Sequence, residues 1–129
     1  MSEPSMAGAA TTEIDARRFA IEAARVAADA RCENVAVLEL SGLSSIADYF
    51  VIATGTSDRQ MIATLDRIAE FGRSVGRKPF RTSDSRSATW LLADYVDVVV
   101  HVFDARSRDY YDLDGLWGDA PRIDWSAAG

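Results

Sequence analysis

The chain has 129 residues and a formal net charge of -6, which fits a single domain that can bury its own hydrophobic core. The acidic balance argues against a protein that binds nucleic acid by neutralising many phosphates, because that mode needs clustered Lys and Arg. The single cysteine, Cys32, excludes an internal disulfide and a Cys-rich zinc site, and it is typical of a reducing compartment.

The first ten residues, MSEPSMAGAA, have neither the basic start nor the apolar run of a signal peptide. No segment approaches the roughly 20 apolar residues of a membrane-spanning helix. We therefore expect a cytoplasmic protein without membrane contact. Its predicted organisation is a disordered tail at residues 1–11, one domain at residues 12–117 and a C-terminal tail at residues 118–129.

One helix and two strands are predicted for the first part of the domain. In TEIDARRFAIEAARVAADAR, the residues Ile14, Ile21 and Ala28 recur at helical spacing. Thr12 is the expected N-cap of this helix. The run NVAVLEL is short and rich in Val and Leu, which predicts a strand. DYFVIATG, residues 48–55, has hardly a polar side chain and predicts a strand covered on both faces.

A second helix is predicted in GTSDRQMIATLDRIAEFGRSVG, where Ser57 and Gln60 have the spacing of a capping box. Gly76 is its expected C-terminal cap. A short edge strand is expected around Phe80, and the neighbouring runs WLLADY and DVVVHVFD predict an antiparallel hairpin. A short helical segment, SRDYYDLDGLW, follows. The predicted fold class is α/β, with a mixed five-stranded sheet flanked by helices in the order αββαβββα.

The loop ATGTSDRQ leads from a strand through Gly55 into a helix N-terminus, where backbone N–H groups can hold a phosphate. The favoured interpretation is a plain strand-to-helix turn closed by the Ser57 cap. An alternative interpretation is a small nucleotidyltransferase or hydrolase that uses Gly55, Ser57 and Asp48 with His101. That alternative predicts binding of a nucleotide or Mg²⁺.

The only histidine, His101, lies within DVVVHVFD. Strand alternation places it on one face with Val99 and Phe103, and places three further valines on the other face. Since its neighbours are apolar and no Ser or Cys is paired with it, we interpret His101 as a core or interface residue.

Two pairs of acids were considered as metal ligands. Asp94 and Asp97 flank the predicted hairpin turn, where Asp is expected for its bonds to the backbone. Asp112 and Asp114 have a two-residue spacing that points helical carboxylates in divergent directions, so they are interpreted as solvated acids. No metal site and no cofactor is predicted.

The richest cluster is aromatic and apolar and lies around the hairpin and the segment after it. Trp and Tyr side chains belong to cores, but they also anchor protein interfaces, because they bury much area at low entropy cost. Composition leaves both readings open for Trp90, Tyr110, Tyr111, Leu113, Leu116 and Trp117.

Three segments in this order resemble the bacterial ribosomal silencing factor (Iojap-related) family: SGLSSIADYFVIATGTSDRQ, then W with DYVDVVVHVFD, then SRDYYDLDGLW. The resemblance extends from about Ile14 to Trp117. It implies a nucleotidyltransferase-like fold without the catalytic acids of a transferase, and therefore a protein that is not an enzyme. It also implies binding to a uL14-type protein on the intersubunit face of the large ribosomal subunit, which blocks joining of the small subunit and represses translation under nutrient limitation. Family members form homodimers.

The same resemblance assigns residues to the partner-binding surface. Trp90 and Trp117 are expected to be buried anchors, and Arg108 a rim or pairing charge. The remaining positions that match the surface are Tyr110, Leu113 and Leu116.

The sequence departs from the family pattern at two places. Ser83 and Asp84 stand where Glu-Gly is usual, and Val96 replaces the usual glycine of the hairpin turn. Val is β-branched and resists positive φ, which predicts a different type of turn. A last alternative is a dimeric adaptor without a ribosomal role, in which the homodimer itself covers the aromatic cluster.

Overall fold

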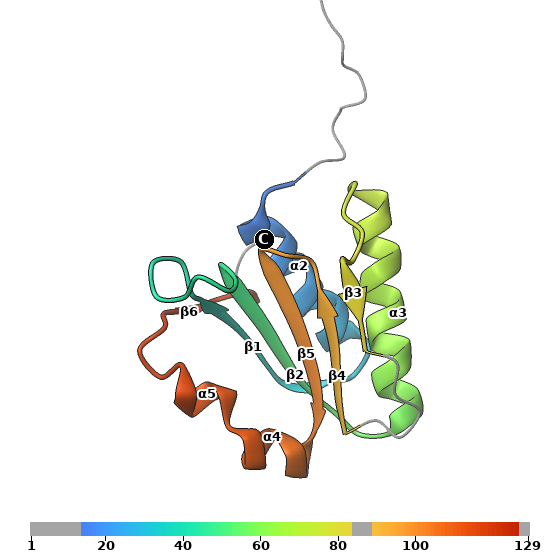
Figure 1. Ribbon diagram of the computed structural model, residues 1–129. Coiled ribbons are helices and arrows are strands. Elements are labelled where there is room, and N and C mark those ends of the chain that lie inside the picture. Colours follow the sequence, from blue (N-terminus) through green and yellow to red (C-terminus); the bar gives the residue numbers. More distant parts are fainter. Residues whose placement is uncertain (1–13, 84–88, 127–129) are drawn as a thin grey trace, which may run out of the picture.

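One mixed sheet runs through the protein, with its strands in the order β3-β4-β5-β2-β1-β6 (Figure 1). The computed structural model describes residues 14–83 and 89–126. The expected tail at residues 1–11 lies outside the described residues. The α/β class predicted from the sequence is confirmed, but the sheet has six strands and not five.

The central strands are β2 (Tyr49–Gly55) and β5 (Val98–Asp104), which pair in parallel. Every residue of β2 is buried, as its nearly uninterrupted apolar run predicts. β1 (Glu33–Glu39) lies antiparallel to β2 on one side. On the other side β4 (Trp90–Asp94) forms the predicted antiparallel hairpin with β5. β3 (Arg81–Thr82) is an edge strand beside β4.

The sixth strand, β6 (Arg122–Ile123), pairs antiparallel with β1 and corrects the expected C-terminal tail. Trp125 follows it, packs against the core and donates its indole N–H to the Val35 carbonyl at 3.0 Å. The segment after residue 117 therefore closes the sheet along the free side of β1.

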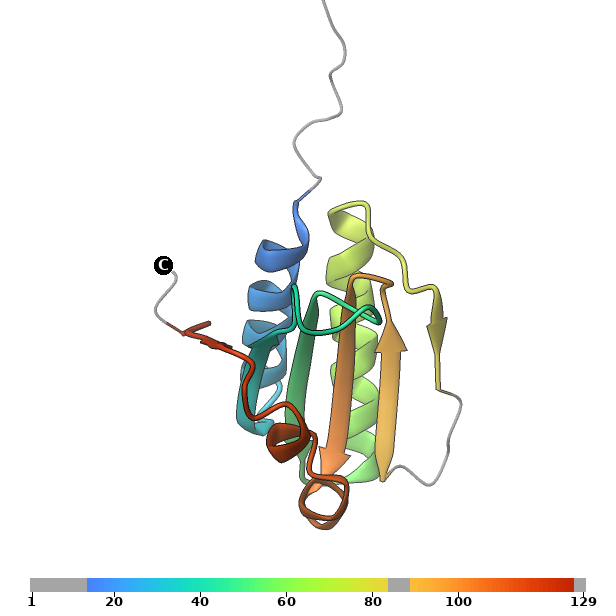
Figure 2. The same ribbon diagram turned by 60° about the vertical axis from the view of Figure 1, so that its left-hand side comes forward.

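Two long helices cover one face of the sheet, α2 (Ala16–Asp29) and α3 (Asp58–Ser74) (Figure 2). The N-cap of α2 is Asp15, whose side chain accepts the Arg18 backbone N–H at 2.8 Å. The prediction of Thr12 as the cap is therefore wrong, and Thr12 lies outside the described residues. Both ends of α3 are as predicted: Ser57 accepts the Gln60 N–H at 3.1 Å, and Gly76 has φ +78°.

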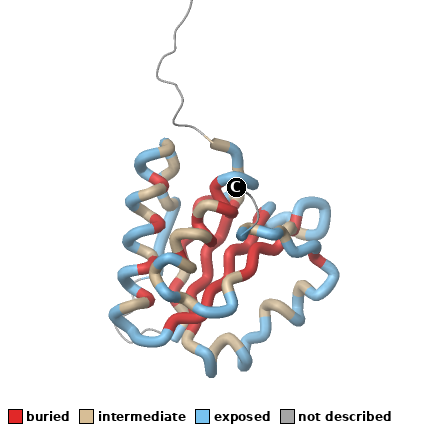
Figure 3. The backbone as a smooth tube through the Cα atoms, turned by 180° about the vertical axis from the view of Figure 1, so that it is seen from behind, coloured by how far each residue is buried: buried red, intermediate tan, exposed pale blue. Residues whose placement is uncertain are grey.

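The opposite face of the sheet is covered much more thinly, by α4 (Ala105–Tyr111) and α5 (Leu113–Leu116). Neither of these short helices contains a buried residue, whereas the strands beneath them are buried (Figure 3). The buried residues on this face include Phe50, Val99 and Phe103. On this face, buried strand residues lie beneath two short helices whose side chains are mostly exposed.

The hairpin turn between β4 and β5 contains Val96 at φ +77°. Val96 therefore adopts a positive φ although β-branched residues resist it, and the change of turn type relative to the family stays a prediction. Asp94 holds the turn by accepting the Val96 backbone N–H at 2.8 Å, and the Tyr95 N–H donates to the Val98 carbonyl at 2.8 Å. The left-handed conformation costs Val96 about 1–2 kcal/mol relative to glycine.

None of the helices in residues 14–83 and 89–126 has both the length and the apolar character to cross a membrane.

Candidate partner-binding surface

A continuous path of aromatic rings runs from α4 down to the sheet. Tyr110 and Tyr111 meet edge to face with their centroids 5.0 Å apart. Tyr111 lies 4.6 Å from the Trp90 ring, and Trp90 stacks on Phe103 at 4.9 Å. Trp90 and Phe103 are also directly opposite each other in the register of the β4–β5 hairpin. The hairpin and α4 therefore present these rings as one packed unit.

His101 continues this path beneath Trp90. The indole N–H of Trp90 donates to Nδ1 of His101 at 3.1 Å. The imidazole contacts Phe50 edge to face at 4.5 Å, and Phe50 lies 6.2 Å from Trp117. The two tryptophans, on β4 and just after α5, are thus linked through two buried rings of the sheet.

Burial keeps His101 uncharged. Its side chain is only 4% exposed, and removal from water lowers its pKa to about 4, partly opposed by the charge of Asp94. Because Nδ1 accepts the bond from Trp90, the neutral ring carries its proton on Nε2. This Nε2 has no hydrogen-bond partner among the described residues, and an unpaired buried donor costs about 1–3 kcal/mol. The strand alternation predicted for His101 is confirmed by the two core clusters.

The outer members of the cluster are exposed. Tyr110 is 79% exposed, Leu116 71% and Tyr111 47%. The inner members Trp90, Leu113 and Trp117 are partly buried against the sheet. We call this set the aromatic surface, and it consists of Trp90, Tyr110, Tyr111, Leu113, Leu116 and Trp117.

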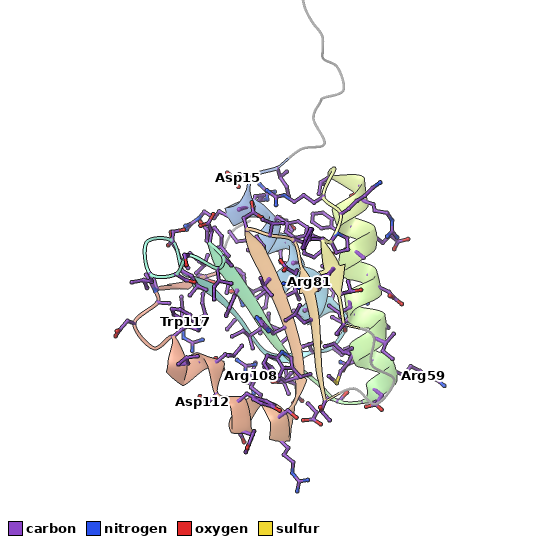
Figure 4. All side chains as sticks on the ribbon, in the orientation of Figure 1. Asp15, Arg59, Arg81, Arg108, Asp112 and Trp117 are labelled. Carbon is purple, nitrogen blue, oxygen red and sulfur yellow. The ribbon has the colours of Figure 1, made fainter. Side chains whose placement is uncertain are left out.

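Arg108, expected as a rim or pairing charge of the partner-binding surface, is largely buried and makes its ion pair within the chain, with Asp114 (Figure 4). Its side chain is 13% exposed, and its guanidinium binds the Asp114 carboxylate with two bonds of 3.0 and 3.2 Å. It also donates to Thr54 Oγ1 at 3.0 Å and to the Asn34 carbonyl. Arg108 therefore ties α4 and α5 to β1 and β2.

Asp114 is the centre of this network and not the solvated acid that the sequence predicted. Burial alone would raise its pKa, but hydrogen bonds and charge from Arg108 and Arg122 outweigh burial and hold the pKa below its usual range. Arg122, at the start of β6, binds the same carboxylate at 3.2 Å. The neighbouring acid, Asp112, caps α5 by accepting the Gly115 N–H at 3.0 Å. A Cβ at position 115 would lie 2.3 Å from the Asp112 carboxylate, so a larger residue there would displace this capping side chain.

The residues of the enzyme alternative do not form one site. Asp48 precedes β2 and Ser57 follows it, so the strand, about 20 Å long, separates them. His101 pairs with Ile52 in the middle of the strand. The backbone N–H of Thr56 is already bonded to the Gln60 side chain at 2.7 Å. The described part of the chain contains no cluster of three His, Cys, Asp or Glu residues that could hold a metal ion.

Some surface features were missed or only partly foreseen. Leu43 and Ile46, in the loop between β1 and β2, are 50% and 72% exposed, and no sequence pattern distinguishes them from core residues. Of the two departures from the family pattern before the hairpin, Ser83 extends the pairing of β3 with β4 through two 2.8 Å bonds to the Leu92 backbone. Asp84 lies outside the described residues.

The fold and the surface define the class of the protein. It is a small mixed α/β domain with an exposed aromatic surface, and the acid, hydroxyl and imidazole groups considered for catalysis lie apart along β2 and β5. Comparison with known proteins gives the family. Residues 13–128 match the family model described as ribosomal silencing factor during starvation, and the chain belongs to this family.

Individual relatives agree with this assignment. The chain is 41% identical over 102 residues to the ribosomal silencing factor of Bacillus subtilis (strain 168), covering 79% of this chain and 86% of that protein. It is 31% identical to the chloroplastic Iojap protein of Zea mays, covering 82% of this chain and 46% of that protein. A crystal structure of a Chromobacterium violaceum protein superposes with a TM-score of 0.75 at 30% identity, covering 81% of this chain and 88% of that one. The name of the Bacillus subtilis relative, ribosomal silencing factor, describes a regulatory role.

Proposed function

We propose that this protein binds a uL14-type protein on the intersubunit face of the large ribosomal subunit through the aromatic surface. Bound there, it blocks joining of the small subunit by occupying the space between the subunits, and it represses translation under nutrient limitation. The mechanism is steric, so it requires no reaction and no cofactor.

The observation that carries this proposal is the exposure of Tyr110 and Leu116 above a rigid aromatic base. Tyr110 is 79% and Leu116 71% exposed, while Phe103 and His101 beneath are 0% and 4% exposed. Exposed large apolar side chains that gather on one part of a domain mark a contact site. Its packed base means that little side-chain freedom is lost on binding, which favours affinity.

Cosedimentation with separated ribosomal subunits tests the proposal. Wild-type protein is expected to bind the large subunit and not the small one. Tyr110→Ala and Leu116→Ala are each expected to cost about 2 kcal/mol of binding, roughly 30-fold in affinity. Both side chains are so exposed that folding should be unaffected. Phe80→Ala is the matched control, because Phe80 is 71% exposed but lies beside β3 at the other edge of the sheet.

The half-buried anchors need a second measurement. Trp90→Ala and Trp117→Ala are expected to lose binding as well, but they also remove packing from the sheet, so their unfolding free energies must be measured in parallel. A subunit-joining assay then tests the mechanism: wild-type protein lowers the yield of joined ribosomes and Tyr110→Ala does not. Unchanged binding of Tyr110→Ala and Leu116→Ala would exclude the aromatic surface as the contact.

A homodimer is a further part of the proposal, and it rests on the family resemblance. Analytical ultracentrifugation of the wild type and of Tyr110→Ala separates this proposal from the adaptor alternative. If Tyr110→Ala dissociates the dimer and wild-type protein binds neither subunit, the aromatic surface serves a second copy of the chain and the ribosomal role is wrong.

A further inference from the structure

Trp90 is held in place from three sides. Its ring stacks on buried Phe103 at 4.9 Å and meets exposed Tyr111 at 4.6 Å, and its indole N–H donates to Nδ1 of His101 at 3.1 Å. The two ring contacts allow the indole to slide or turn over, because neither fixes the direction of the N–H group. Among the described residues, the bond to His101 is the directional contact of the indole ring.

We propose that His101 is a positioning residue of the aromatic surface, which accepts the Trp90 indole N–H and thereby fixes the orientation in which Trp90 and Tyr111 meet the partner. This inference rests on the proposed function. It gives His101 a role in recognition although its side chain is only 4% exposed and does not reach the partner.

A purely structural role explains His101 poorly. The ring lies on an apolar face among Phe50, Phe103 and Leu92, where an aliphatic side chain would pack without leaving Nε2 unpaired. What an aliphatic residue cannot supply is the acceptor for Trp90. Because the pKa of His101 is lowered to about 4, Nδ1 is free to accept at every pH above that value.

A pair of substitutions of nearly equal size separates the acceptor from the packing. His101→Asn places a carbonyl oxygen close to the position of Nδ1, whereas His101→Leu has no acceptor. We expect the leucine variant to be the more stable of the two, because asparagine buries an additional amide. We expect the opposite order in binding to the large subunit: within about threefold of the wild type for Asn, and at least about tenfold weaker for Leu.

The hydrogen bond itself is followed by the ¹⁵N–¹H NMR signal of the Trp90 indole, assigned with Trp90→Phe. In wild type and His101→Asn this proton should be shifted downfield and protected from exchange, and in His101→Leu it should lose both properties. If His101→Asn does not fold, His101→Leu alone is compared with the wild type. The inference then requires that the leucine variant is folded and binds the large subunit about tenfold more weakly.

The outcomes separate the two proposals. If binding follows stability, so that His101→Leu binds at least as well as His101→Asn or as the wild type, His101 does not position the surface and the inference is wrong. If wild-type protein does not bind the large subunit, the proposed function fails and this inference fails with it.

Discussion

His101 shows how one buried residue links the interior of the sheet to its surface. Its position in DVVVHVFD was enough to predict the face on which it lies, because alternation along a strand is strict. Its bond to Trp90 was not predictable without the register of the hairpin, which places Trp90 opposite Phe103 and thus diagonal to His101. The imidazole is neutral and buried, and this has a measurable effect on stability.

The free energy of unfolding should decrease as the pH is lowered, because of His101. In the unfolded chain a histidine binds a proton below about pH 6.5, whereas in the folded protein the pKa of His101 is about 4. Between these values the unfolded state binds more protons, so the free energy of unfolding decreases as the pH falls through this range. The loss approaches about 3 kcal/mol.

Urea unfolding at pH 7 and pH 4.5 measures this loss, with His101→Leu as the reference for all other groups. The wild type should lose more stability than the leucine variant over this interval. Parallel losses in the two proteins would contradict the burial of a neutral imidazole.

Arg108 marks the limit of prediction at single residues. The family resemblance implies that Arg108 is a rim or pairing charge of an interface. Its partners Asp114, Thr54 and the Asn34 carbonyl come from α5, β2 and β1. No local pattern connects these segments, so the buried network appears only in the folded chain.

At the scale of elements, α4 and α5 form a strap over the sheet that contacts it through Tyr111 and Leu113. Neither helix has a buried residue, and α5 has only four residues. Isolated helices of such length are unstable in water. The strap therefore depends on the cap at Asp112 and on the Arg108–Asp114 network for its conformation.

Arg108→Gln is expected to loosen the strap selectively. It leaves the partly buried Asp114 with a single remaining ion pair, and we expect amide hydrogen exchange in residues 105–117 to accelerate by about tenfold or more, equivalent to about 1.4 kcal/mol. Exchange in β2 and β5 should change much less. Arg122→Gln is the control, because Arg122 is 55% exposed and makes one bond to Asp114, so its effect should be under about threefold. Equal effects of the two variants would contradict the assigned role.

The long elements were predictable, and of the short ones the edge strand near Phe80 and the helical segment after β5 were predicted, whereas β6 was not. The helix over Asp58–Ser74 has a cap, a periodic apolar face and a terminal glycine, and the prediction matched at both ends. The two-residue strand Arg122–Ile123 has no room for any periodicity. It exists because the free side of β1 accepts it and because the Glu39 N–H donates to the Pro121 carbonyl at 2.8 Å. The first helix begins three residues later than predicted, with Asp15 as its cap, because a sequence that offers several good capping residues does not by itself determine which one is used.

At the scale of the whole molecule, the two faces of the sheet are covered by helices to different extents. α2 and α3 bury one face thoroughly, so that Phe19, Met61 and Ile68 are fully buried. The other face has the strap and the aromatic surface. The nucleotidyltransferase-like fold that the family resemblance implies draws attention to the end of β2 at Gly55, but that turn already uses its own side chains as caps.

ATP with Mg²⁺ should therefore leave the melting temperature unchanged. A ligand at 100 times its dissociation constant would add about 2.7 kcal/mol of stability, which a thermal shift assay detects readily. Titration with millimolar ATP and Mg²⁺, with Mg²⁺ alone as the control, tests this expectation. A shift that depends on both components would restore the enzyme alternative.

The order of the strands also determines when the protein can fold during its synthesis. β2 pairs with β5, some 50 residues later in the chain, and β1 is paired on its free side only by Arg122–Ile123. Contacts between segments so distant in sequence form late. A nascent chain that has not yet reached residue 98 lacks β5, the parallel partner of its most apolar strand β2, and α4, α5 and Trp117 follow later still. We therefore expect the aromatic surface to be absent from the growing chain and to form only once nearly all of it has emerged from the ribosome that makes it.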